Sequence, residues 1–151
     1  MTTVRVPSPS DVPEYPERPA VDWDHPPPEL GDLVEWFERI SYGLVLLEPY
    51  SLDHLRSAID RFDSAVRDHS QRTVLPPVRS VSDRLGAILR ADHRWFSQSF
   101  EQLRWFFEVV ERDDHGGNRQ ALGQFGRLVT ESVRRHLADE RSYFGGPAAY
   151  P

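Results

Sequence analysis

The fold is decided by the stretch from residue 81 to residue 110, which reads VSDRLGAILRADHRWFSQSFEQLRWFFEVV. Its apolar residues recur at intervals of three and four, the period of an α-helix that buries one face. This apolar stripe consists of Val81, Leu85, Ile88, Leu89, Trp95, Phe96, Phe100, Leu103, Phe106, Phe107 and Val110. We therefore predict a long helix over residues 78–112, ended by the paired glycines at 116 and 117.

Three further segments with the same period flank this helix. The first covers residues 30–48 and is stopped by Pro49, with an apolar stripe of Leu33, Phe37, Ile40, Leu44 and Leu47. The second starts after Ser51, a good N-terminal cap, and fades near Arg72. The last follows Asn118 and ends at the glycines 145 and 146. Four helices with short connections predict an all-α protein, an antiparallel four-helix bundle.

The prolines divide the chain into domains. Eight of the 13 prolines lie within the first 28 residues, a composition that excludes helix and central strand. We predict an extended proline-rich tail over residues 1–28, the bundle over 29–146, and a short C-terminal tail over 147–151. Tyr15, Val21 and Trp23 are apolar anchors in the first tail, which is either mobile or packed on the bundle or on a partner.

Composition excludes several classes of chemistry. The 151 residues contain no cysteine and no lysine, which rules out disulfides, thiolate chemistry, zinc fingers and lysine Schiff bases. With 18 arginines against 24 acidic residues the net charge is −6, so we expect no nucleic-acid partner. The chain has neither the apolar core of a signal peptide nor a run long enough to cross a bilayer, and we expect a cytoplasmic protein without a membrane partner.

Polar residues interrupt the apolar stripes of the last two helices. Asp92 falls within the stripe of the long helix with His93 on its flank, and His136 and Glu140 lie within that of the following helix. If the two helices are antiparallel, all four residues come to one level. Histidine and carboxylate at positions i and i+4 share a helix face, the way in which bundles present ligands to iron, manganese or zinc. We predict a metal site here, with Asp92 either bridging or supporting a ligand from behind.

The residues around this site resemble a known family. LRADHRWF at 89–96, followed by RHLADERSYF at 135–144, is similar to the hemerythrin-like (HHE cation-binding) domain over residues 80–145. The resemblance implies a four-helix bundle with a non-haem di-iron centre, ligated by His93, His136 and Glu140, and a role in dioxygen, redox or metal sensing or in storage. The family draws further ligands from two later helices, which the two N-terminal helices would replace here. His54 lies about 100° from the stripe of its helix. His69 faces inward, but we expect it to be too distant from His93.

Two other readings of the same residues stay open. The polar cluster can be a hydrogen-bonded structure without metal, built for example on His136 and Asp92. Trp36 and Trp105 are predicted to project away from the stripes of their helices. Together with Tyr15 and Trp23 of the tail they would give a docking surface for a protein partner or a second copy of the chain. No catalytic motif is evident, which favours a binding protein over an enzyme.

Two glycines inside the last helix predict close packing. Glycine normally destabilises a helix, so Gly123 and Gly126 are best explained by the tight approach of a neighbouring helix.

Overall fold

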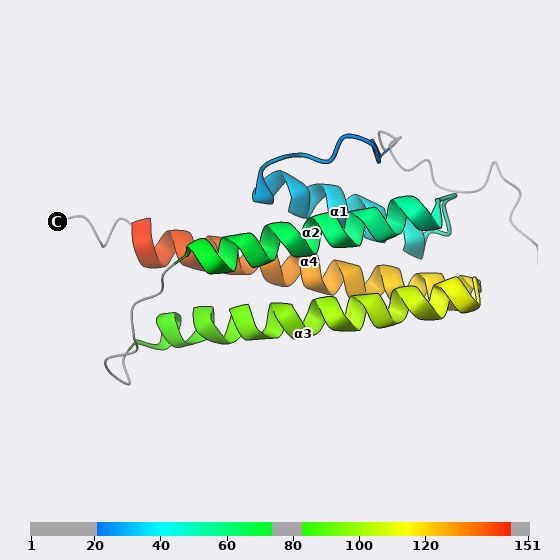
Figure 1. The fold of residues 1–151 in the computed structure, drawn as a ribbon. Helices are drawn as coiled ribbons and strands as arrows, with labels where there is room; N and C mark the ends of the chain where they lie inside the picture. Colours follow the sequence, from blue (N-terminus) through cyan, green and yellow to red (C-terminus); the bar gives the residue numbers. More distant parts are fainter. Residues whose placement is uncertain (1–20, 74–82, 146–151) are drawn as a thin grey trace, which may run out of the picture.

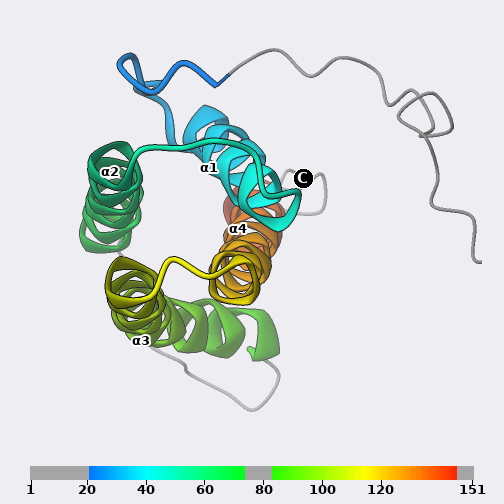
Figure 2. The same cartoon turned by 90° about the vertical axis from the view of Figure 1, so that its right-hand side faces the viewer.

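The computed structural model describes residues 21–73 and 83–145 and shows four antiparallel α-helices (Figure 1). They are α1 (Leu30–Val45), α2 (Leu52–Arg72), α3 (Arg84–Arg112) and α4 (Gly116–Gly145), and the described part of the chain contains no strand. Seen along the bundle, α1 lies beside α2 and α4, and α3 closes the ring between them (Figure 2). The predicted all-α four-helix bundle is confirmed.

The ends of the helices follow local chemistry, with three differences from prediction. Helix α3 begins at Arg84 and not at residue 78, because the Asp83 side chain caps it by accepting from the backbone N–H of Gly86; residues 78–82 lie outside the described part. Ser51 caps α2 as expected, its Oγ accepting a hydrogen bond from the backbone N–H of His54 at 3.4 Å. Helix α1 ends earlier than predicted, because Leu47 has a positive φ of 57° and its side chain is exposed. Helix α4 begins at Gly116, and Asn118 lies inside it, where its side-chain amide donates to the carbonyl of Asp113.

Helices α1 and α4 approach closely at the two glycines of α4. A Cβ atom placed on Gly123 would lie 2.5 Å from the carbonyl oxygen of Ser41, and one on Gly126 would meet the Ser41 hydroxyl. Side chains larger than hydrogen therefore have no room there, which confirms the predicted tight approach. The core that fills the bundle draws on all four helices and includes Leu33, Phe37, Leu55, Phe62, Leu89, Phe100, Leu103, Leu122 and Val129.

The described part of the N-terminal tail, residues 21–28, packs on its own bundle. The indole N–H of Trp36 donates to the carbonyl of Asp22 at 3.1 Å, and Trp23 stacks on His54 with ring centroids 5.7 Å apart. Trp36 is only 8% exposed, so the prediction that it is free to form a docking surface was wrong. The helical pattern assigned its outer face to solvent, whereas residues 21–28 cover it. Tyr15 lies outside the described residues.

None of the described helices has the length and apolarity that crossing a lipid bilayer requires.

Candidate metal centre

Four side chains from three helices converge near one end of the bundle. His69 lies on the last turns of α2, His93 lies near the start of α3, and His136 and Glu140 lie near the end of α4. Each contributes one potential ligand atom, and these four atoms all lie within 4.8 Å of one another. Such convergence from three helices is what a metal site in a bundle requires.

The distances within this cluster are close to the spacing of ligands around one ion. His93 Nε2 and His136 Nε2 are 3.1 Å apart, and the Oε2 atom of Glu140 lies 2.6 Å from His69 Nε2 and 3.5 Å from His136 Nε2. Four ligands placed tetrahedrally at about 2.0–2.1 Å from a metal are about 3.4 Å apart. The pairs at 3.1 and 3.5 Å already have about this spacing, whereas the 2.6 Å pair would have to open and the widest pair, at up to 4.8 Å, to close around a single ion.

Asp92 lies behind His136 rather than among the four atoms. Its Oδ2 is 3.0 Å from Nδ1 of His136, whose side chain is completely buried. A carboxylate that accepts the Nδ1–H of a histidine fixes the tautomer in which the Nε2 lone pair is free to bind a metal. Of the two roles predicted for Asp92, the geometry corresponds to support of a ligand and not to a bridge.

Hydrogen bonds alone leave one atom of the cluster without a partner. Nε2–H of His93 can donate to His136, and Nε2–H of His69 can donate to Glu140. The second carboxylate oxygen of Glu140, Oε1, is buried and has no hydrogen-bond partner among the described residues. An unpaired buried carboxylate oxygen is costly, and a cation beside the carboxylate would remove much of that cost. The donor set thus fits a metal ion better than it fits a closed hydrogen-bond network.

The electrostatics of His93 favour its neutral form. Burial lowers the pKa of its imidazole below the usual 6.5, and the neighbouring His136 lowers it further. Neutral imidazole is the form that binds metals. The site therefore holds this histidine in its ligating state.

His69 belongs to the cluster, so the expectation that it is too distant from His93 was wrong. The rings of the two residues are 6.4 Å apart, and His69 touches Glu140 directly. The heights of the three histidines along the bundle agree when they are counted from the end where α2 starts, α3 ends and α4 starts. His69 lies 17 residues after the start of α2, His93 lies 19 before the end of α3, and His136 lies 20 after the start of α4. Because those three helix ends meet at the same end of the bundle, the three histidines come to one height.

The remaining histidines lie elsewhere, as expected. His54 stacks on Trp23, and its Nε2 is 3.6 Å from a carboxylate oxygen of Asp24. His25 and His115 are exposed, the former against Asp22 and the latter in the connection between α3 and α4.

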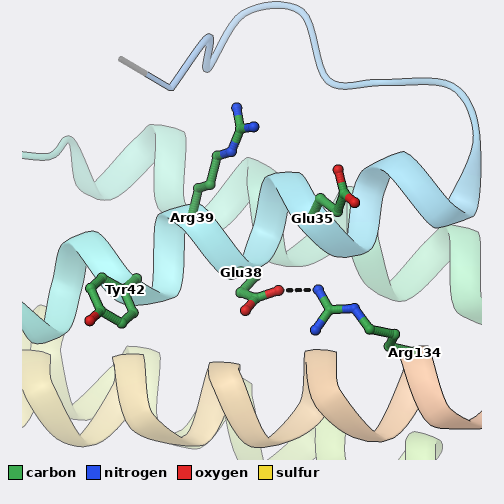
Figure 3. Close-up of a pocket in the computed structure, with 5 residues that line it drawn as sticks. All are labelled: Glu35, Glu38, Arg39, Tyr42 and Arg134. Carbon is green, nitrogen blue, oxygen red and sulfur yellow. Dashed lines mark hydrogen bonds and ion pairs between the residues drawn. The ribbon is translucent and has the colours of Figure 1, made fainter. Parts of the chain in front are cut away.

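A surface hollow between α1 and α4 offers no comparable chemistry (Figure 3). Glu38 and Arg134 point toward each other across it and form an ion pair, while Glu35 and Arg39 point away from α4. It shares no residue with the cluster and holds no arrangement of nucleophile and base. A second hollow, between the start of α1 and the end of α2, is lined in part by His69 and so reaches the edge of the cluster.

Comparison with known proteins gives no relative. No protein-family model, no curated protein and no solved structure matches the chain. The resemblance to hemerythrin-like domains therefore stays a prediction from the quoted residues, and the function has to be argued from the chemistry of the site.

Proposed function

We propose that the protein binds one divalent first-row transition-metal ion through His69, His93, His136 and Glu140. The observation that supports this most directly is the convergence of four ligand atoms, from three helices, within 4.8 Å of one another. Three imidazole nitrogens with one carboxylate suit iron, zinc or manganese, whereas Mg²⁺ and Ca²⁺ prefer oxygen ligands throughout. With no cysteine in the chain, histidine and carboxylate are the strong ligands it can offer.

The proposal is for a single ion, unlike the di-iron centre of the family that the sequence resembles. Two-iron sites in bundles use several carboxylates, contributed by facing helices. In the described residues the cluster holds one carboxylate, that of Glu140, and Asp92 is turned toward Nδ1 of His136. Helix α1 contributes no residue to it. Four ligand atoms are enough for one ion and too few for two.

A role in sensing or storing the ion, or in redox and dioxygen sensing, agrees better with this site than catalysis does. His136 and Glu140 are buried, and three histidines with one carboxylate fill the four positions of a tetrahedral ion, as in closed sites. Iron bound there would supply one-electron redox chemistry. The residues of the chain would hold the ion and, through Asp92, orient one imidazole.

The direct test is the metal content of the purified protein. Protein prepared without chelator is analysed for metals, and the metal-free form is titrated with Fe²⁺ under anaerobic conditions and with Zn²⁺ and Mn²⁺. We expect about one ion per chain, bound much more weakly by His136→Ala and Glu140→Gln. His25→Ala removes an exposed histidine and is the matched control, with unchanged binding. Binding that is absent in the wild type, or equal in all four proteins, would refute the proposal.

A second candidate, an interaction protein without metal, is favoured by one observation. Trp105 on α3 is 52% exposed, as predicted. Trp36 and Trp23, in contrast, make contacts within the chain, with Asp22 and His54 respectively. An exposed tryptophan is a frequent anchor of protein interfaces. Sedimentation of the wild type and of Trp105→Ala would test self-association, and a monomer in both cases would remove that form of this candidate.

A further inference from the structure

The end of α2 that carries His69 extends beyond the apolar face of its own helix. The buried residues of α2 end at Val66. Just before it, the buried Asp63 pairs with Arg104 of α3 at 2.5 Å, which is the last ion pair between the two helices in the described part. Residues 67–72, called here the C-terminal turn of α2, therefore contribute no apolar side chain to the core.

The polar contacts of the C-terminal turn are nearly all internal to α2. Arg67 pairs with Asp63, Arg72 pairs with Asp68, and the Ser70 hydroxyl donates to the carbonyl of Val66. Within the described part of the chain, the polar contact that leaves this turn for another helix is that of His69 with Glu140. The turn is thus attached to the bundle through one histidine.

The other three ligands lie on helices that are held together independently of the site. On α3, Leu89 and Phe96 are buried on either side of His93, and on α4 Val133 is buried one turn before His136. The rings of Phe96 and His136 also pack nearly perpendicular to each other, with centroids 5.2 Å apart. His93, His136 and Glu140 are therefore held by the core without an ion, whereas His69 is held by its contact with Glu140 and by ring contacts with His93 and His136.

We propose that the bound ion fastens the C-terminal turn of α2 to the α3–α4 pair, so that metal occupancy controls the docking of this turn. This inference rests on the proposed metal binding. Docking and binding are linked, and the linkage is reciprocal. The factor by which His69 strengthens ion binding equals the factor by which a saturating ion disfavours release of the turn. Loss of a direct ligand is expected to cost at least the upper part of the range known for supporting residues, about 100-fold.

Hydrogen exchange measures this linkage at single amides. The amides of residues 70–73 are followed in the full-length protein with and without saturating Zn²⁺, and those of residues 58–66 on the same helix are the internal reference. We expect Zn²⁺ to slow exchange at 70–73 by about 100-fold, and by much less at 58–66, which the core already protects. The Zn²⁺ affinity of His69→Ala is measured in parallel. The factor by which His69→Ala weakens Zn²⁺ binding has to equal the factor by which Zn²⁺ slows exchange at 70–73 in the wild type.

The controls separate this inference from the metal proposal. His69→Ala should bind Zn²⁺ weakly through the remaining ligands and show no ion-dependent slowing at 70–73. His54→Ala, at the opposite end of the same helix, should retain both properties of the wild type. If the wild type binds one Zn²⁺ without a change at 70–73, or if His69→Ala binds as tightly, the ion is held by α3 and α4 alone and the inference is wrong. If His69→Ala does not fold, the exchange experiment on the wild type still decides whether the ion affects residues 70–73. If the wild type binds no ion at all, both proposals are refuted.

Discussion

At the scale of single residues, the site depends on how each imidazole is oriented. His136 has little freedom in this respect, because its buried ring has Asp92 at Nδ1, His93 and Glu140 at Nε2, and the Phe96 ring packed perpendicular to it. A ligand fixed in this way loses little conformational entropy when it binds a metal. The contribution of Asp92 can therefore be isolated by changing the carboxylate without changing its size.

We predict that Asp92→Asn weakens metal binding by about 10- to 100-fold, the range known for residues that support a ligand. The amide can donate as well as accept, and so no longer enforces the Nδ1–H tautomer of His136. Isothermal titration of the metal-free protein with Zn²⁺ measures the effect. Asp139→Asn is the control, since it removes the same charge next to Glu140, and in the described part of the chain Asp139 has no hydrogen bond or ion pair with a ligand. Equal affinities for the two variants would contradict the role assigned to Asp92.

Sequence alone could place part of this site. The interruption of two apolar stripes identifies His93, His136 and Glu140, and the i, i+4 spacing identifies the last two as neighbours. His69 was excluded because it lies near the far end of its helix, whereas the count from the opposite end of the bundle brings it level with His93. The orphaned oxygen of Glu140 and the position of Asp92 behind His136 depend on side-chain rotamers, which periodicity does not encode.

At the scale of helices, the interface of α1 and α4 is set by two missing side chains. Gly123 lets the backbone of α4 lie against the carbonyl of Ser41, and Gly126 lies against the hydroxyl of the same residue. That hydroxyl donates to the carbonyl of Phe37 within α1, so it has little freedom to move away. The sequence predicted the close approach, because two glycines in a helix require an explanation.

We predict that Gly123→Ala destabilises the protein by about 1–3 kcal/mol, the usual cost of overpacking, although alanine favours the helix itself. Gly31→Ala on α1 is the matched control, since a Cβ there meets nothing within 4 Å. It should be neutral or stabilising by up to about 1 kcal/mol. Urea unfolding followed by circular dichroism gives both free energies. Equal effects of the two substitutions would mean that α1 and α4 are not packed at Gly123.

The two connections at one end of the bundle are joined by a tyrosine. Tyr50, just before α2, donates its hydroxyl proton to Asp114 at 3.0 Å, and Arg119 pairs with the same carboxylate. Burial and then Asp114 raise the pKa of Tyr50 to about 12 from the usual 10. The folded-state pKa is the higher one, so the stabilising contribution of this tyrosine is complete below pH 10 and is lost as pH rises from 10 to 12.

We therefore predict one tyrosine that ionises about two pH units later than an unperturbed tyrosine does. Titration of phenolate absorbance in wild-type protein and in Tyr50→Phe identifies it by difference. In Asp114→Asn the late titration should move toward pH 10, because the acceptor charge is gone. A wild-type curve that superimposes on that of Tyr50→Phe, after scaling for the number of tyrosines, would show that Tyr50 is unperturbed.

At the scale of the whole molecule, periodicity was enough for the number of helices, and the short connections were enough for their antiparallel packing. Periodicity failed where a segment without it covers a helix. Residues 21–28 have no helical pattern, yet they hide Trp36 and add Val21 and Trp23 to the edge of the core. The surface that the pattern of a single helix assigns to solvent is therefore the largest area that could be free to bind a partner, because other segments can cover part of it.

We predict that Trp23→Ala lowers the free energy of unfolding by about 2 kcal/mol, roughly what burying a large apolar side chain contributes. Trp105→Ala should change it by less than about 0.5 kcal/mol, since its side chain is half exposed. Thermal or urea unfolding compares the two variants. The reverse order of effects would mean that residues 21–28 do not pack on the bundle in solution.

The short connection between α3 and α4 also bears on the order in which the chain folds. Only residues 113–115 separate these helices. His93 and His136 are therefore brought together when a helical hairpin with a three-residue loop closes. His69 is 71 residues away from Glu140 and must wait for a far larger loop to close. We expect the hairpin to assemble first and the rest of the chain to join it later. A partly folded chain would then hold three of the four ligands together before α2 docks with His69.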